Sequence, residues 1–191
     1  MRLENGFEVS APATLVWDVL NDVPAVVPCM PGAELTETLG GDRWKAVVHV
    51  KLGPVAFEFE ATVTRELVDA AERRVVLVVD ARERRGRGAA HATIDSTLSE
   101  SEGITFVELV TDLTLKGTVA QYGRGLVPSV AAQLTGEFAA NLARLIEKRD
   151  EPSRPEPAKP VPVSGLRLLL RTLSALLKSL GSRLLRQSRA G

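Results

Sequence analysis

Apolar and polar residues alternate with a period of two over much of residues 33–117, and a shorter stretch near Leu3 shows the same pattern. This alternation is typical of β-strands that bury one face and expose the other. The connectors Gly40-Gly41-Asp42 and Ser101-Glu102-Gly103 are short and rich in turn residues, which favours hairpins. The pattern therefore predicts one N-terminal strand followed by an antiparallel meander. The clearest strands of the meander cover 44–52, 55–67, 73–84, 88–99 and 103–116.

Two other segments have the spacing of amphipathic helices. The first follows Ser10-Ala11-Pro12, where we expect Ser10 to cap the helix and Pro12 to occupy its first turn. The second is a long helix that ends near Arg149, and Pro128 is expected to kink it or delay its start. Its apolar stripe consists of Leu126, Val130, Leu134, Phe138, Leu142 and Ile146. Because this stripe is the large apolar surface available to cover the sheet, we predict an α+β fold.

The C-terminal part of the chain differs in composition from the rest. Residues 150–165 contain five of the 11 prolines, which predicts an extended linker between a body over 1–149 and a helix over 166–189. That helix is amphipathic, with a leucine-rich face and a cationic face. The leucines are Leu166, Leu169, Leu170, Leu173, Leu176, Leu177, Leu180 and Leu184, and the cations opposite them are Arg167, Arg171, Lys178 and Arg189.

The charge distribution indicates what this helix meets. The net charge of the chain is zero, but residues 152–191 carry eight Lys or Arg and one acidic residue, whereas residues 1–151 carry 16 basic and 23 acidic residues. A basic, leucine-rich helix is typical of segments that lie on an anionic membrane. Residues 152–191 lack aromatic side chains for base stacking, which argues against nucleic acid. We expect reversible, peripheral membrane attachment, and docking of the helix on its own body is the alternative.

The body offers few groups for catalysis. His49 and His91 alternate with apolar neighbours, so we expect them on the exposed face of the sheet, together with Glu58 and Glu60. Cys29 lies in an apolar turn, which favours a structural role. Alternation leaves almost no acid or base on the inner face, and the sequence contains no metal-ligand or dinucleotide-binding motif. A basic cluster is interpreted as a solvated strand end, with an acidic partner or a membrane as the alternative; it comprises Arg82, Arg84, Arg85 and Arg87.

A cavity is the more informative expectation. A curved sheet closed by a single helix usually leaves one, because the helix cannot fill the concave face. Such a cavity suits an apolar ligand with a small polar head, for which the Tyr122 hydroxyl is a candidate contact. The predicted ligand-binding residues are Val48, Val50, Phe57, Phe59, Leu113, Leu115, Tyr122, Leu126, Val130, Leu134 and Phe138.

Three groups of residues in the body resemble a known family. They are Ala11-Pro12-Ala13-Thr14-Leu15-Val16-Trp17-Asp18-Val19-Leu20 with Cys29-Met30-Pro31-Gly32, then Lys51-Leu52-Gly53-Pro54-Val55, then Lys116-Gly117-Thr118-Val119-Ala120-Gln121-Tyr122-Gly123. With the order of the predicted elements, they make residues 1–148 similar to the CoxG-like proteins of carbon monoxide dehydrogenase, a family of the START/Bet v 1-like (SRPBCC) superfamily. The sequence departs from the family at Ala61 and at 82–87, where the family more often has glycines. The resemblance implies the helix-grip fold, a curved antiparallel sheet wrapped on a long C-terminal helix.

The resemblance also implies a partner and a location. The family is associated with molybdenum-containing carbon monoxide dehydrogenase at the cytoplasmic face of the cell membrane, and the superfamily binds apolar ligands in the grip cavity. We therefore expect a non-catalytic accessory protein without a tightly bound cofactor, which carries a quinone, with menaquinone as the candidate, to the respiratory chain. The alternatives are a membrane tether or maturation factor that holds no ligand, and a small enzyme of the cyclase or hydratase type.

Overall fold

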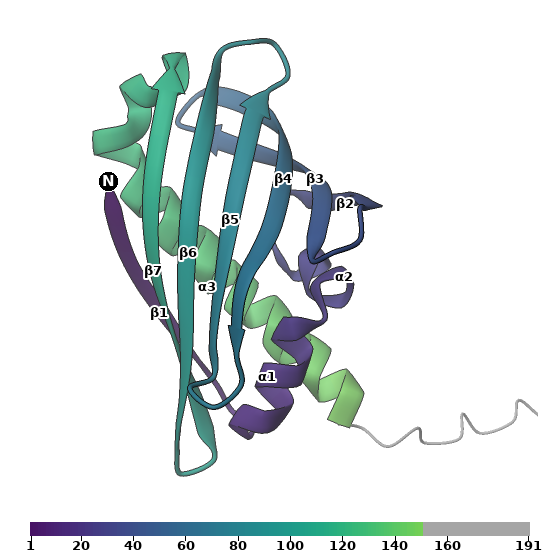
Figure 1. Cartoon of the computed structure of the whole chain (residues 1–191). Helices are drawn as coiled ribbons and strands as arrows, with labels where there is room; N and C mark the ends of the chain where they lie inside the picture. Colours follow the sequence, from purple (N-terminus) through teal and green to yellow (C-terminus); the bar gives the residue numbers. More distant parts are fainter. Residues whose placement is uncertain (151–191) are drawn as a thin grey trace, which may run out of the picture. The chain divides into compact units, whose positions relative to one another are not determined.

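The computed structural model describes residues 1–150 (Figure 1). Apart from residue 150, the predicted linker over 150–165 lies outside the described residues, as does the tail helix over 166–189. The strands are β1 (Arg2–Val9), β2 (Ala33–Thr38), β3 (Arg43–Leu52), β4 (Val55–Asp69), β5 (Arg74–Glu83), β6 (Gly88–Ser101) and β7 (Ile104–Gly117). The helices are α1 (Ala13–Asn21), α2 (Val23–Val26) and α3 (Gly123–Asp150), with 3-10 turns η1 (Val27–Cys29) and η2 (Thr118–Tyr122).

The strands form one antiparallel sheet in the order β1-β7-β6-β5-β4-β3-β2. Consecutive strands from β2 to β7 are therefore neighbours, as the predicted meander requires, and β1 pairs with β7. In Figure 1, α3 runs behind the curved sheet and covers one of its faces. The predicted α+β helix-grip architecture is confirmed. Because the strands alternate in direction, the β3–β4 turn, the β5–β6 turn and η2 share one end of the sheet, which we call the η2 end.

The register shows which residues share the inner face of the sheet. Directly opposite residues in an antiparallel pair point to the same face. Val48 lies opposite Phe59, and Val50 lies opposite Phe57. Leu115 joins the same face because it pairs with Ala90, which continues the row through Ala81 to Ala61. The alternation therefore assigned the strand faces correctly, including the exposed positions of His49 and His91.

Two hydrophobic clusters fill the space between the sheet and the helices. The α1 cluster lies beneath α1 and the C-terminal half of α3; its buried members are Val9, Ala11, Val16, Val19, Leu98, Val107, Leu142 and Ile146. The Phe57 cluster lies towards the η2 end; its buried members are Leu52, Phe57, Phe59, Ala61, Ala81 and Val119. Burying one such aliphatic side chain contributes about 1.5–3 kcal/mol, so the α1 cluster forms the stable core against which the cleft described below is built.

The start of α1 differs from the prediction. Pro12 precedes the first helical residue, and Ser10 makes no capping hydrogen bond. Instead, the backbone N–H of Ala13 donates to the Glu100 carboxylate at 2.9 Å. A carboxylate is a better acceptor than a hydroxyl near the positive end of a helix, and β6 brings it there from a distant part of the chain. The predicted Ser10 cap is therefore wrong.

The start of α3 also differs from one of the two expected outcomes. The helix begins at Gly123, five residues before Pro128, so the proline lies inside the helix and does not delay its start. A proline there removes one backbone hydrogen bond, which the first turns of the helix tolerate better than its middle. The C-terminal end at Asp150 agrees with the predicted end near Arg149.

Candidate ligand-binding cleft

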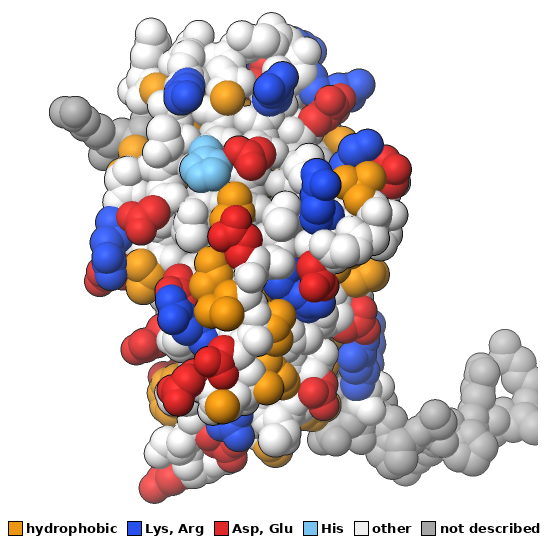
Figure 2. Space-filling view, in the orientation of Figure 1, with side chains coloured by type: hydrophobic (Ala, Val, Ile, Leu, Met, Phe, Trp, Pro, Cys, Tyr) orange, Lys and Arg blue, Asp and Glu red, His pale blue; other side chains and the backbone are white. Residues whose placement is uncertain are grey.

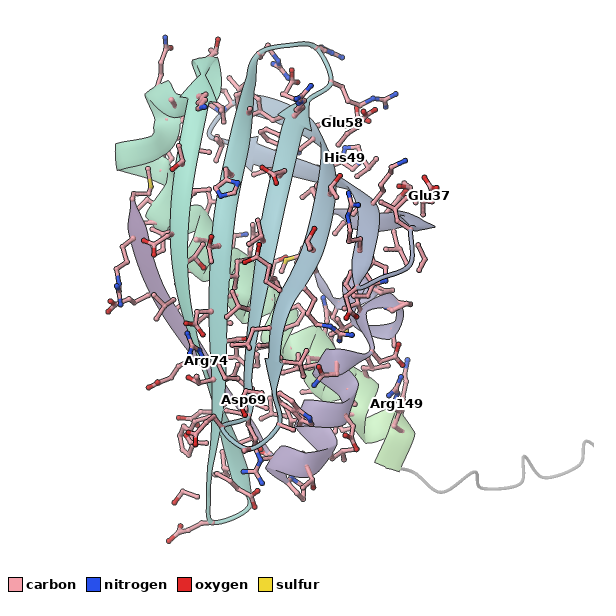
Figure 3. All side chains as sticks on the ribbon, in the orientation of Figure 1. Glu37, His49, Glu58, Asp69, Arg74 and Arg149 are labelled. Carbon is pink, nitrogen blue, oxygen red and sulfur yellow. The ribbon has the colours of Figure 1, made fainter. Side chains whose placement is uncertain are left out.

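A cleft of about 520 Å³ opens between α3, the segment that follows η1, and the ends of β3, β4 and β5. Its lining combines apolar side chains with charged ones. The residues of the cleft are Pro31, Gly32, His49, Val50, Lys51, Ala56, Phe57, Glu58, Glu83, Arg85, Arg87, Val130, Gln133, Leu134 and Glu137. Figure 3 labels His49 and Glu58, which lie on neighbouring strands at the edge of this region.

Four of the predicted ligand-binding residues line the cleft. Val50 and Phe57 come from the inner face of the sheet, and Val130 and Leu134 come from α3 one turn apart. Phe57 is only 2% exposed, so its ring forms part of the core as well as the floor of the cleft. Four further predicted residues pack in the Phe57 cluster beside the cleft: Val48, Phe59, Leu115 and Tyr122. Leu113 shares their face, since it pairs with Ala92 on β6.

Two predicted residues lie elsewhere. Phe138 was expected opposite Phe57, but its ring packs edge-on against Phe7 at 5.7 Å, within the α1 cluster. Leu126 was expected on the buried stripe, but it is 37% exposed. Both follow from the position of α3, because the helix stripe continues past the cleft at both ends. The C-terminal turns meet β1, while the N-terminal turns reach the β3–β4 turn at Gly53.

The cleft contains a buried ion pair that the sequence analysis missed. Glu83 ends β5 on the inner face, opposite Phe59, and is 4% exposed. Its carboxylate accepts from the Arg87 guanidinium at 2.6 and 3.0 Å and from the backbone N–H groups of Arg85 and Arg87 at 2.8 and 3.0 Å. The side-chain hydrogen bond from Arg87, with help from these backbone bonds, lowers the pKa of Glu83 from 4.5 to about 2. Glu83 is therefore ionised and fully engaged at neutral pH.

Arg87 is held over the floor of the cleft. Its guanidinium lies 4.6 Å from the centroid of the Phe57 ring, which favours a cation–π interaction. Nη2 also donates to the backbone carbonyl of Ala56 at 2.7 Å, so two strands fix the side chain. Nη1 has no hydrogen-bond partner within residues 1–150. Arg87 thus offers a donor to the cleft while Glu83 fixes its orientation and balances its charge.

Tyr122 completes this group. Its ring packs edge-on against Phe57 at 5.8 Å, and its charge when ionised would be felt by Arg87, whose pKa is raised mainly by Glu83. The predicted polar contact therefore lies next to the cleft floor but is joined by a stronger one. Alternation from Val79 through Ala81 placed Glu83 on the inner face, and its spacing of four from Arg87 suits a pair. Treating 82–87 as one solvated cluster concealed both signals.

The other arginines of that cluster divide into two kinds. Arg84 forms ion pairs with Glu58 and with Glu60, the latter at 3.2 Å, and lowers the pKa of Glu58 mainly through its hydrogen bond. Arg82 and Arg85 are exposed. The interpretation as a purely solvated strand end is therefore wrong for Arg84 and Arg87 and holds for the other two.

The wall formed by η1 depends on local features of Cys29-Met30-Pro31-Gly32. Cys29 is buried, as expected, and burial raises the pKa of its thiol. Its backbone carbonyl accepts from the Asn141 side chain of α3 at 3.0 Å. Gly32 has a φ of +74°, and a Cβ there would lie 2.5 Å from the His49 carbonyl oxygen. Glycine is thus required for this segment to approach β3 and close the side of the cleft.

A second hollow, of about 820 Å³, lies on the outer face of the sheet. Its side chains carry both signs of charge, including Lys45, Glu60, Asp80 and Arg82. Figure 2 shows this face, on which basic and acidic side chains are interspersed. His91 and Asp80 form an exposed pair here at 2.8 Å. Because this hollow lacks a buried apolar floor, the cleft beside Phe57 is the better candidate for an apolar ligand.

Comparison with known proteins identifies the family. Residues 6–147 match the carbon monoxide dehydrogenase family CoxG. The chain belongs to the CoxG family. Membership supports a role associated with carbon monoxide dehydrogenase. No curated protein sequence gives a significant match. Within residues 1–150 there is no group of acidic, His and Cys side chains suited to a metal, and no helix long and apolar enough to span a membrane.

Solved structures agree with the fold of this CoxG-family chain. A conserved protein from Geobacillus kaustophilus has a TM-score of 0.69 at 21% identity and covers 78% of this chain and 96% of its own. The ZhuI aromatase/cyclase from a Streptomyces species has a TM-score of 0.56 at 19% identity, covering 78% and 94%. Norcoclaurine synthase from Thalictrum flavum has a TM-score of 0.50 at 14% identity, covering 78% and 87%. At these identities the likeness concerns the fold alone.

Proposed function

We propose that this CoxG-family protein is a non-catalytic carrier that holds a quinone, with menaquinone as the candidate, and links carbon monoxide dehydrogenase to the cytoplasmic membrane. The observation that carries the proposal is the cleft itself. Its floor is apolar, with Val50, Phe57, Val130 and Leu134, and the donor oriented over that floor is Arg87. A quinone has matching parts, since its isoprenoid chain is apolar and its ring carbonyls accept hydrogen bonds.

The chemistry gives such a carrier a purpose. Oxidation of carbon monoxide with water yields carbon dioxide, protons and an electron pair, and it occurs at an enzyme in water. A quinone takes up an electron pair and protons to become a quinol, but its chain keeps it in the bilayer. A protein that shields the chain in a cleft can present the ring to the dehydrogenase. The predicted tail helix over 166–189 would keep the carrier at the membrane surface.

The polar groups of the cleft favour binding over catalysis. A general acid or base works best when its pKa lies near the ambient pH. The pKa of Glu83 is held at about 2, and its carboxylate is occupied by Arg85 and Arg87. Glu83 is consequently poorly suited to proton transfer at neutral pH. This arrangement supports a carrier rather than a cyclase-type or hydratase-type enzyme.

The test is to identify what the protein carries. The full chain is purified without detergent, extracted with organic solvent, and the extract is analysed by mass spectrometry. We expect a quinone in an amount comparable with the protein. An extract free of quinones, from protein that still binds the dehydrogenase, would favour the ligand-free tether or maturation factor.

A second measurement concerns Arg87. Replacing Arg87 with Met removes the donor and keeps the apolar stem, while Arg82→Met makes the same change at an exposed site outside the cleft. We expect Arg87→Met to retain about tenfold less quinone than Arg82→Met, as expected for one charge-assisted hydrogen bond of about 1.5 kcal/mol. Equal retention by the two variants would remove Arg87 from the site.

A further inference from the structure

The η2 end of the body concentrates positive charge. The three connections that meet there, residues 51–56, 82–89 and 116–124, contain seven Lys or Arg and one acidic residue. The connections at the opposite end, residues 38–43, 69–74 and 100–105, contain three basic and five acidic residues. In Figure 2, basic side chains gather at the upper end, and acidic ones predominate at the lower end. The η2 end thus has the opposite sign to the body as a whole.

Four of these cations are exposed. Arg84 and Arg87 are paired with acidic residues, as described above. Lys51, Arg82, Arg85 and Lys116 are exposed and form no ion pair with any side chain in the described part of the chain; we call these four the basic edge. Arg82 and Lys116 both lie opposite Ala89, on either side of β6, so their Cα atoms are about 10 Å apart. The basic edge therefore extends across several strands.

Apolar side chains are exposed beside the basic edge. Leu126 is 37% exposed and lies against the β3–β4 turn, where a Cβ added to Gly53 would be 3.5 Å from its Cδ1 atom. Pro54, the next residue in that turn, is exposed as well. The cleft opens in the same region, because Lys51 and Arg85 also line it. Cations, exposed apolar residues and the opening of an apolar cleft thus occur together at one end.

We propose that the η2 end docks on an anionic lipid surface, with the basic edge against phosphate headgroups and with Leu126 and Pro54 at the boundary with the acyl chains. Each cation near such a surface strengthens binding about fivefold. An acidic protein surface would also attract the cations, but it gives no reason for exposed apolar residues around the cleft opening. The purpose of docking rests on the proposed function, since it would turn the cleft towards the bilayer and let an apolar ligand enter without crossing water.

The experiment measures which end of the full chain meets the membrane. Single fluorophores are attached at Gln121→Cys, in η2, or at Ser101→Cys, at the opposite end; both sites are exposed, whereas Cys29 is buried. Quenching by aqueous acrylamide is measured with vesicles of phosphatidylcholine and phosphatidylglycerol, and with phosphatidylcholine alone. We expect the mixed vesicles to shield the label at position 121 and not the label at position 101. Added salt should reduce the shielding.

Charge variants separate this contact from attachment by the tail. Arg85→Gln with Lys116→Gln should weaken the shielding of position 121 by about fivefold for each cation removed, while the protein still pellets with vesicles. The matched control, Arg43→Gln with Arg144→Gln, changes two exposed cations elsewhere and should leave the shielding unchanged.

The proposal is overturned if position 121 stays open to acrylamide on mixed vesicles, or if both double variants behave alike. It is also overturned if shielding appears only on adding carbon monoxide dehydrogenase without lipid, because the basic edge then belongs to a protein interface. Quinone extraction from the same samples reports separately on the proposed carrier function.

Discussion

Single residues decide how polar the cleft is. Arg87 lies between the Glu83 carboxylate and the Phe57 ring, so a positive charge sits over an apolar floor without being left unpaired. A buried charge that loses its partner is strongly destabilising, which explains why both members of the pair occur together. The small residues nearby serve the same geometry. Gly88 allows β6 to pass close to β7, since a Cβ there would lie 2.3 Å from the Lys116 carbonyl oxygen.

Filling the cleft should block the ligand and spare the fold. Leu134→Trp adds bulk opposite Phe57, and we expect a loss of about 1–3 kcal/mol in the free energy of unfolding from overpacking. The variant should lose its extractable quinone and fail to couple oxidation of carbon monoxide to quinone reduction. Ala132→Trp, on an exposed position of the same helix, is the control and should retain both. If Leu134→Trp carries and couples like the wild type, the quinone binds elsewhere.

The Glu83 carboxylate should make stability depend on pH in the acid range. Its pKa is lowered from 4.5 to about 2 in the folded protein, so its stabilising effect is complete above about pH 4.5 and is lost as the pH falls towards 2. Urea denaturation at several pH values should show the free energy of unfolding falling over this range. The fall should be shallower in Glu83→Gln than in the wild type. Glu60→Gln, which removes an exposed carboxylate, should follow the wild-type curve; the same curve for Glu83→Gln would contradict the assignment.

At the scale of elements, contacts between distant segments set the helix ends and the cleft walls. Glu100 on β6 supplies the acceptor at the start of α1, and Asn141 of α3 binds the Cys29 carbonyl of η1. The family-like motifs acquire a physical meaning here. Gly32, Gly53 and Gly117 each have a positive φ where one connection passes close to another element around the cleft.

Removing the Glu100 acceptor should destabilise the protein more than removing the Ser10 hydroxyl. Glu100→Gln weakens the hydrogen bond to the Ala13 N–H, and Glu100→Ala abolishes it; the latter should lower the free energy of unfolding by about 0.5–2 kcal/mol, as for other helix caps. Ser10→Ala should change it by less than about 0.5 kcal/mol. Urea midpoints at constant m-value measure both effects. A larger effect for Ser10→Ala would restore the local cap predicted from the sequence.

At the scale of the whole molecule, the body and the C-terminal segment have separate tasks in our proposal. The family match ends at residue 147 and α3 ends at Asp150, so the elements that form both hydrophobic clusters precede the proline-rich linker. The tail sequence supplies leucines and cations in a pattern suited to a membrane surface.

Deleting residues 152–191 should leave a folded body. Because the two clusters consist of residues in 9–146, the thermal midpoint should change little, and ligand extraction should still yield quinone. Most of the pelleting with anionic vesicles should disappear, since the basic edge alone provides few charges. Unfolding of the truncated chain would show that the C-terminal segment belongs to the core. Unchanged pelleting would show that the body is the main anchor.

The tail should bind through both of its faces. Replacing Arg167, Arg171 and Lys178 with Gln should weaken binding to anionic vesicles by about 3 kcal/mol at most, and binding to neutral vesicles much less. Replacing Leu173, Leu177 and Leu180 with Asp should eliminate both, because the apolar face then carries charge. Vesicle sedimentation over a range of salt concentrations measures these differences. Equal losses on neutral and anionic vesicles after the charge change would contradict the electrostatic contribution.

The strand order, the strand faces and the long C-terminal helix follow from the amino-acid pattern alone. Period-two alternation is imposed by one buried face, and turn residues leave little choice of connection in a meander. For that reason Val50, Phe57, Val130 and Leu134 could be predicted on the correct surfaces. The motifs around Cys29-Met30-Pro31-Gly32 and Lys51-Leu52-Gly53-Pro54-Val55 were sufficient to indicate the family.

Which of those surfaces meet depends on the folded chain. Phe138 and Leu126 share a stripe with Leu134, but the path of α3 across the sheet takes them to Phe7 and to the β3–β4 turn. Alternation gives a face and not a partner, so spacing could not supply the contact of Arg87 with Glu83 or the cap from Glu100. The basic edge exists for the same reason, because antiparallel strands bring three separate connections to one end of the sheet.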